Sequence, residues 1–270
     1  MRQRISHFLI DLRARRAFSV IDRLAYWRRR LLTARRNRAF RAANPDFPVP
    51  PLALLWDAQA TTDLTDYKTS GEETAAEYWE LMRPYLDASP SRPPRVCEWG
   101  CGPARIIRHL PHLVGGRTLE FYGTDYNRAS IRWCREHLPG VTFVENELAP
   151  PLPFEDRFFD LLYARSVFTH LSPELQHRWV EDIARALKLG GVFILTTHGD
   201  AYRRRLTAQE CARYDAGELV IRTLAAEGRK LFAAFHSPLS VRAKLLAGFT
   251  ILEHRPGHDT QDIWVTRVPT

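Results

Sequence analysis

The sequence contains no run of about 18 apolar residues, the length that a helix needs to cross a lipid bilayer. It also lacks an early apolar segment followed by a small-residue cleavage site, so we predict neither a transmembrane helix nor a secretory signal. Cysteine is scarce, with 4 residues in 270, and none forms a CxxC pair or stands at zinc-finger spacing from a histidine. We therefore expect a cytoplasmic protein of a reducing compartment, without structural disulfides.

Acidic residues are almost absent from residues 1–44, where thirteen arginines face only Asp11 and Asp22. This segment contributes about +11 to the net charge of +8, so the rest of the chain sums to about −3. Apolar residues at helical spacing predict a basic amphipathic helix over 2–42. The excess of arginine over lysine indicates a bacterial protein from a GC-rich genome.

Three roles are open to this basic arm. It could lie on an anionic membrane surface with its apolar stripe inserted, which would place the protein at the inner face of the membrane. It could contact nucleic acid phosphates, which we favour least. Our default expectation is that the stripe packs against the domain or a partner subunit and leaves the arginines in solvent.

Composition and periodicity divide the chain into three parts. Residues 1–44 form the basic arm. Residues 45–94 hold an extended linker, marked by four prolines between 45 and 55, and a second helix. Residues 95–270 form the main domain, with an insert at about 200–246.

Short apolar strands alternate with helices in the main domain. The expected strands are 95–99, 119–124, 141–145, 159–163, 191–197, 248–254 and 262–268. The expected helices are 72–87 before the domain, and 104–113, 127–138 and 173–188 within it. In the insert we expect a helix, a hairpin that turns near Glu227-Gly228, and a helix over 238–247. This alternation predicts an α/β fold with a doubly wound sheet.

The strongest local signal is the segment 96–102 (VCEWGCG), where an apolar strand runs into Gly100 and Gly102. Such glycines let the backbone turn sharply and approach a ligand closely. The start of the following helix offers unpaired N–H groups to an anionic group. A tight turn that binds nothing would give the same pattern.

A second signal lies one strand later, where 119–124 ends in Asp125. An acid at this place can accept hydrogen bonds from two ribose hydroxyls, although it could instead cap the next helix. Two further blocks follow. The segment 152–163 (LPFEDRFFDLLY) enters a buried strand, and in 186–195 (ALKLGGVFIL) a helix ends at a glycine pair before a strand begins.

These four blocks, in this order and spacing, resemble the class I S-adenosylmethionine-dependent methyltransferases, in particular their small-molecule and glycan type. The resemblance covers residues 95–197 and the closing strand pair at 248–268. It implies a Rossmann-like, seven-stranded and mostly parallel sheet with an antiparallel last strand. It also implies that the cofactor is S-adenosylmethionine.

The resemblance further implies which residues bind the cofactor: Tyr67, Gly71, Glu98, Gly100, Gly102, Asp125, Tyr126, Asn146, Glu147 and Arg165. Glu98 and the two glycines would border the methionine moiety. Asp125 would hold the ribose and Tyr126 would lie beside the adenine. Asn146 or Glu147 would lie near the adenine amino group. Tyr67 and Gly71 would close over the cofactor from the second helix, although a helix N-cap at residue 69 or 70 explains that segment equally well.

Methyl transfer from a sulfonium is an in-line displacement, for which an enzyme mainly holds the nucleophile close and aligned. An oxygen nucleophile benefits from a general base. Three histidines are expected near the carboxyl ends of strands or on the insert, and we rank His170 first and His198 second, ahead of His236. Each could equally be a hydrogen-bonded histidine of a loop or core.

The acceptor is indicated only by exclusion. Enzymes that methylate exocyclic base nitrogens usually carry an Asn/Asp/Ser-Pro-Pro-aromatic run after the fourth strand, where this chain has 163–167 (YARSV). We therefore expect a hydroxyl or carboxyl acceptor on a small molecule or a lipid-linked glycan, with the 200–246 insert as a substrate wall. No acidic cluster suggests a catalytic metal.

Two other functions fit parts of the sequence. An NAD-dependent oxidoreductase would share the fold class, but its G-x-G-x-x-G fingerprint is broken, because Pro103, Ala104 and Arg105 follow Gly102. A non-catalytic scaffold could bind S-adenosylmethionine and use its basic arm to bind RNA or protein.

Overall fold

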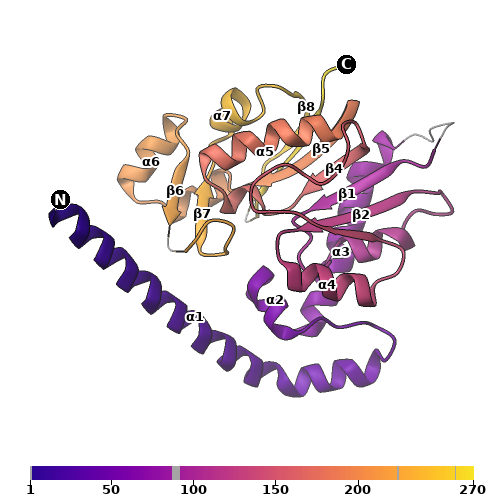
Figure 1. Ribbon diagram of the computed structural model, residues 1–270, viewed down its shortest axis with the longest axis horizontal. Coiled ribbons are helices and arrows are strands. Elements are labelled where there is room, and N and C mark those ends of the chain that lie inside the picture. The colour runs from indigo at the N-terminus through magenta and orange to yellow at the C-terminus, as the bar shows by residue number, and fades with distance from the viewer. Residues whose placement is uncertain (1, 87–91, 224, 259) are drawn as a thin grey trace.

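The computed structural model describes residues 2–86, 92–223, 225–258 and 260–270. A central sheet forms its core, with helices on both faces and one long helix along the outside (Figure 1). The α-helices are α1 (Arg2–Ala43), α2 (Leu52–Gln59), α3 (Leu64–Met82), α4 (Arg128–His137), α5 (Pro173–Ala186), α6 (Ala208–Asp215) and the short α7 (Pro238–Ser240).

The central sheet has seven strands in the order β3-β2-β1-β4-β5-β9-β8. Their bounds are β1 (Arg95–Trp99), β2 (Glu120–Asp125), β3 (Thr142–Glu145), β4 (Phe159–Ala164), β5 (Leu187–Thr197), β8 (Thr250–Arg255) and β9 (Asp262–Arg267). The first five pair in parallel, and β9 runs antiparallel to both β5 and β8. The expected fold class, a doubly wound sheet with an antiparallel last strand, is confirmed.

Two apolar layers cover the sheet, because successive side chains of a strand point to opposite faces. On β1, Val96 packs in the layer with α3 and α4, and Cys97 packs in the layer with α5. All six residues of β4 are buried, as expected for a strand covered on both faces. The strand order reverses between β1 and β4, and in such sheets ligands bind outside the carboxyl ends of the strands at this point.

The segment before the sheet differs from the prediction. The expected linker at 45–55 holds α2, which starts directly after Pro51. The expected helix at 72–87 starts earlier, at Leu64, because Asp63 caps it by accepting hydrogen bonds from two backbone N–H groups. The helix expected at 104–113 is instead a turn followed by a 3₁₀ helix (Ile107–His112) that contains a proline.

The insert between β5 and β8 contains the expected hairpin, formed by β6 (Val220–Thr223) and β7 (Phe232–Phe235). Gly228, the expected turn residue, lies in the connection between these strands. Two histidines of the main domain fasten β7: Nδ1 of His170 lies 2.7 Å from the Phe232 carbonyl oxygen, and Nδ1 of His198 lies 3.0 Å from that of Ala234. The hairpin is therefore held beside the carboxyl ends of β4 and β5.

Helix α1 passes along the outside of the molecule and extends beyond the body at its N-terminal end (Figure 1). Its contacts with the body combine polar bonds with a buried aromatic side chain, Phe40. The Asn37 side chain bonds the Thr62 carbonyl and the Leu64 N–H, and Asp22 forms an ion pair with Lys230. Several large apolar side chains of this helix are exposed instead: Val20, Ile21, Leu24, Trp27, Leu31 and Leu32. The expectation that the apolar stripe packs against the domain is therefore wrong for these residues, and packing against a partner subunit stays a prediction.

No helix among the described residues is both long and apolar enough to cross a bilayer.

Candidate active site

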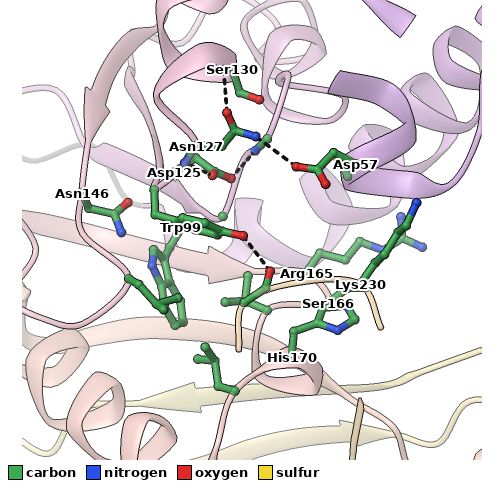
Figure 2. A pocket seen from close by; sticks show the side chains of 18 of the residues that line it. Asp57, Trp99, Asp125, Asn127, Ser130, Asn146, Arg165, Ser166, His170 and Lys230 are labelled. Atoms are coloured by element: carbon green, nitrogen blue, oxygen red, sulfur yellow. Dashed lines mark hydrogen bonds between the residues drawn. The ribbon is translucent and has the colours of Figure 1, made fainter. Parts of the chain in front are cut away.

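A cavity opens at the carboxyl ends of β1, β2 and β4, where the strand order reverses (Figure 2). Asp125 and Asn127 lie on one side of it, and Ser166 and His170 lie on the other. Eight of the twelve predicted site residues line this cavity: Gly100, Gly102, Asp125, Tyr126, Asn146, Glu147, Arg165 and His170. The sequence therefore located the candidate site from segments that lie far apart along the chain.

The floor of the cavity is the glycine turn after β1. Gly100 and Gly102 both adopt a left-handed backbone conformation, with φ of 77° and 52°. The Gly100 N–H donates to the Thr124 carbonyl at 2.8 Å, which ties the turn to β2. A Cβ atom at Gly100 would lie 2.4 Å from Cγ2 of Val167. Only glycine therefore fits at position 100 without moving the loop after β4.

Asp125 is buried at the end of β2. One carboxylate oxygen accepts the Gly102 N–H at 2.7 Å, and the other accepts the Asn127 N–H at 2.7 Å. Burial raises the pKa of Asp125 to about 6, against the lowering effect of these two bonds. The cap of α4 is Asn127, whose side chain accepts from Ala129 and Ser130. The alternative role of Asp125 as a helix cap therefore belongs to Asn127.

Asn146 and Glu147 follow β3 and differ in their surroundings. Asn146 is buried, and its Nδ2 donates to the Glu147 carbonyl at 2.7 Å. Its Oδ1 is buried without a hydrogen-bond partner, which is costly unless a ligand supplies a donor. The Glu147 side chain is 80% exposed and pairs loosely with Arg128. Of the two, Asn146 is the better placed to read a ligand inside the cavity.

The two candidate bases occupy different places. In both histidines, Nδ1 forms a hydrogen bond with a backbone carbonyl of β7. A carbonyl oxygen can only accept, so Nδ1 carries the proton and Nε2 is the acceptor. His170 lines the cavity, and burial lowers its pKa, so its ring is neutral near pH 7. His198 is absent from the cavity wall and packs against the rings of Tyr202 and Phe235. Burial lowers its pKa to about 4.

Three other residues predicted to bind the cofactor, Tyr67, Gly71 and Glu98, do not line the cavity. Each of them makes contacts within the protein instead. The Tyr67 hydroxyl donates to the Pro103 carbonyl at 2.7 Å, behind the glycine turn. Gly71 packs so closely on the next segment that a Cβ would lie 2.3 Å from the Arg105 carbonyl oxygen. The expectation that Tyr67 and Gly71 close over the cofactor is therefore corrected: they hold α3 against the loop after β1.

Glu98 is buried beneath the same loop and does not border the cavity. Its Oε2 accepts the Ile107 N–H and the Tyr163 hydroxyl, both at 3.0 Å. Burial raises the pKa of Glu98 to about 7. Glu98 therefore ties the end of β1 to the segment at Ile107 and to β4.

Arg165 does face the cavity, from the end of β4. Its guanidinium donates to the Thr74 hydroxyl at 2.9 Å, and Arg105 donates to the same hydroxyl at 3.3 Å. Among the described residues no carboxylate forms an ion pair with either arginine. Arg165 therefore offers a positive charge that an anionic ligand group can reach.

Asp57 and Lys230 are two charged residues of the wall that the sequence analysis did not predict. Asp57, on α2, accepts from the Asn127 side chain at 3.2 Å, and Arg229 pairs with the same carboxylate. Lys230 lies beside Asp57 in the wall and bonds the Trp56 carbonyl. No motif marks these residues: Asp57 falls between the predicted linker at 45–55 and the predicted helix at 72–87, and Lys230 follows the predicted hairpin turn.

Comparisons with known proteins agree with this geometry. Residues 96–191 match the family model described as a methyltransferase domain. Over 107 residues the chain is 31% identical to trans-aconitate 2-methyltransferase of Rhodopseudomonas palustris (strain BisB18), a match that spans 37% of this chain and 37% of that protein. Over 183 residues it is 25% identical to a putative methyltransferase of Encephalitozoon cuniculi, covering 67% of this chain and 82% of that one.

A solved structure shares the fold. The SAM-dependent methyltransferase structure from Methanosarcina mazei superimposes with a TM-score of 0.50 at 19% identity, over 70% of this chain and 97% of that chain. The family match and this fold confirm the resemblance to class I methyltransferases, and with it S-adenosylmethionine as the cofactor of such a domain.

Proposed function

With residues 96–191 identified as a class I methyltransferase domain, we propose that this chain transfers a methyl group from S-adenosylmethionine to an oxygen of its acceptor. The acceptor group is a hydroxyl or carboxyl of a small molecule or a glycan. The observation that carries the proposal is one cavity that joins a buried acid, a glycine turn and a neutral histidine.

The residues of the cavity fit the cofactor. Asp125 keeps free lone pairs beside its two backbone bonds, so it can accept from both ribose hydroxyls. The unpartnered Oδ1 of Asn146 can accept from the adenine amino group. Gly100 and Gly102 leave the floor free of side chains, and Arg165 is placed to meet the methionine carboxylate. When bound, the cofactor supplies a methyl group on a positively charged sulfur.

His170 is the proposed general base. Its Nδ1 is committed to the Phe232 carbonyl, which fixes the ring and leaves the Nε2 lone pair for the cavity. A neutral imidazole at this place can take the acceptor's hydroxyl proton as the oxygen attacks. A carboxylate acceptor is already ionised at neutral pH, and His170 would then only help to position it.

The charged side chains of the cavity wall favour an acceptor that carries a carboxylate. With Arg165 assigned to the cofactor, Lys230 is the cation of the wall that an acceptor carboxylate would meet, beside its ion pair with Asp22. The relative from Rhodopseudomonas palustris is named for trans-aconitate, a carboxylate, which is consistent with this choice. The insert that holds Lys230 forms one side of the opening, in agreement with its proposed role as a substrate wall.

The sheet argues against the oxidoreductase alternative. Dinucleotide-binding sheets typically have the parallel order 3-2-1-4-5-6. Here β9 runs antiparallel between β5 and β8. We therefore keep methyl transfer as the proposed function.

The first test is calorimetry with S-adenosylmethionine, S-adenosylhomocysteine and NAD on the wild type, Asp125→Ala and Asp156→Ala. Asp156 is a control, because its carboxylate is 73% exposed and pairs with Arg185 on the surface. We expect micromolar-range binding of the first two ligands by the wild type and the control. Loss of two hydrogen bonds to a charged acceptor should weaken binding by Asp125→Ala at least about tenfold.

Binding of NAD without S-adenosylmethionine would contradict the proposal. Binding of S-adenosylmethionine without transfer to any acceptor in a screen of hydroxylated and carboxylated compounds would favour the non-catalytic scaffold.

A further inference from the structure

One face of α1 carries a row of large apolar side chains in solvent. Val20, Leu24, Trp27 and Leu31 are 59%, 65%, 49% and 75% exposed. They follow one another at intervals of three or four residues, which places them in a single stripe along the helix. Exposed apolar patches of this kind mark interaction surfaces.

The orientation of this stripe is fixed by the opposite face of the same helix. Asp22 accepts from the Trp56 indole N–H at 3.0 Å and pairs with Lys230 at 2.9 Å. Farther along, Thr33 and Asn37 bond the 62–64 turn, and Phe40 is buried in a small apolar cluster. At 100° per residue these side chains lie roughly half a turn from the stripe. The body therefore holds α1 with its apolar stripe facing outward.

Arginines flank the stripe on both sides. Arg23 lies on one side, and Arg28 and Arg35 lie on the other, all of them exposed. Among the described residues no carboxylate forms an ion pair with these three side chains. An apolar stripe with unpaired arginines on both flanks is complementary to a surface that has an apolar interior covered by an anionic outer layer.

We propose that α1 docks on an anionic lipid bilayer, with Val20, Leu24, Trp27 and Leu31 at the acyl–headgroup boundary and the flanking arginines at the lipid phosphates. The charge argues against a second copy of this chain as the occupant, because pairing two such helices would bring arginine against arginine. A nucleic acid would satisfy the arginines and leave the apolar stripe in water. The docking does not depend on methyl transfer.

Only the thickness of α1 separates the docked face from a residue of the cavity wall. Asp22 projects from the body side of α1 and pairs with Lys230, which lines the cavity. The diameter of an α-helix with its side chains is about 10 Å. The lipid surface would therefore lie about one helix diameter from Lys230.

The test is sedimentation of the full chain with vesicles. One set contains equal parts phosphatidylglycerol and phosphatidylcholine, and the other contains phosphatidylcholine alone. We compare the wild type with Leu24→Gln/Leu31→Gln, with Arg28→Gln/Arg35→Gln, and with Leu239→Gln. Leu239 is a matched control, because it is 59% exposed and lies outside α1. Circular dichroism checks that each variant is folded.

We expect the wild type and Leu239→Gln to sediment with anionic vesicles and to stay in solution with neutral vesicles. Binding to the anionic vesicles should weaken as salt is added. Each double variant should bind anionic vesicles at least about tenfold more weakly. The proposal is overturned if the wild type stays in solution with anionic vesicles, or if the leucine variant binds like the wild type. It is also overturned if the stripe instead mediates a dimer in ultracentrifugation, or if only an RNA oligonucleotide binds the arm.

Discussion

At the scale of single residues, burial decides which titratable groups can act. The two histidines predicted from the sequence make the same bond to β7, yet only His170 borders the cavity. Asp125 and Glu98 are both buried acids with raised pKa values, yet only Asp125 lines the cavity. Access to the cavity therefore distinguishes the proposed functional groups from the structural ones.

The histidines give a matched pair of variants. In His170→Asn the amide nitrogen can replace Nδ1 and keep the bond to the Phe232 carbonyl, but no base remains at Nε2. For a hydroxyl acceptor we expect kcat to fall about 10²- to 10⁴-fold, with little change in cofactor affinity. His198→Asn, which keeps the analogous bond to Ala234, should alter kcat little. Equal losses in the two variants would assign His170 a structural role.

The raised pKa of Asp125 predicts a pH dependence of cofactor binding. The ionised carboxylate accepts the ribose hydroxyls, and protonation removes acceptor capacity. Because the pKa is about 6, the dissociation constant for S-adenosylmethionine should be constant above about pH 7 and rise as the pH falls below 6. Calorimetry between pH 5 and 8 measures this. Asp125→Asn should bind weakly without that rise, and His170→Asn should retain it.

At the scale of elements, the β6–β7 hairpin closes one side of the cavity. Gly228 in its loop donates to the His170 carbonyl and accepts from the Tyr126 hydroxyl at 2.8 Å. Lys230 bonds the Trp56 carbonyl of α2. The loop thus joins α2, the end of β2 and the segment after β4, and its position sets the shape of the opening.

Gly228→Ala tests whether this loop shapes the site, and Gly140→Ala is its control. Both glycines have positive φ, 80° and 88°, so alanine strains the two backbones alike, by about 1–2 kcal/mol. A Cβ at Gly228 would also lie 2.8 Å from Leu148, whereas at Gly140 nothing lies within 4 Å. We expect both variants to lose unfolding free energy in urea, but only Gly228→Ala to weaken cofactor binding severalfold. Unchanged affinity would mean that the loop does not shape the site.

At the scale of the whole molecule, α1 is joined to the domain from its middle, at Asp22, to its C-terminal end. The Asn37 side chain accepts the Leu64 N–H at 3.0 Å and donates to the Thr62 carbonyl at 2.7 Å, at the start of α3. Phe40 is buried beside Leu55 and Tyr67. These contacts make the helix part of the folded unit, which is what holds its outer face in a defined direction.

The contribution of the Asn37 contacts to stability can be measured with variants at two neighbouring positions. Asn37→Ala leaves the buried Leu64 N–H without a partner and removes one of the two donors to the Thr62 carbonyl, so we expect a loss of about 2 kcal/mol of unfolding free energy in urea. Arg38→Ala removes an exposed side chain one residue away and should change it by less than about 0.5 kcal/mol. Equal effects would show that the Asn37 contacts do not secure α1.

The seven strands of the central sheet, the glycine turn and the acid at the end of β2 could all be predicted from the sequence. These features are local, because burial of a strand, a left-handed turn and a strand end each leave their mark within a few neighbouring residues. The tertiary structure decided the rest. It placed α2 beside the cavity, put Tyr67, Gly71 and Glu98 in contacts away from the cavity, and brought His170 but not His198 to the cavity wall. It also turned the polar face of α1 to the body. Each outcome depends on contacts between segments far apart in the chain, which local periodicity does not encode.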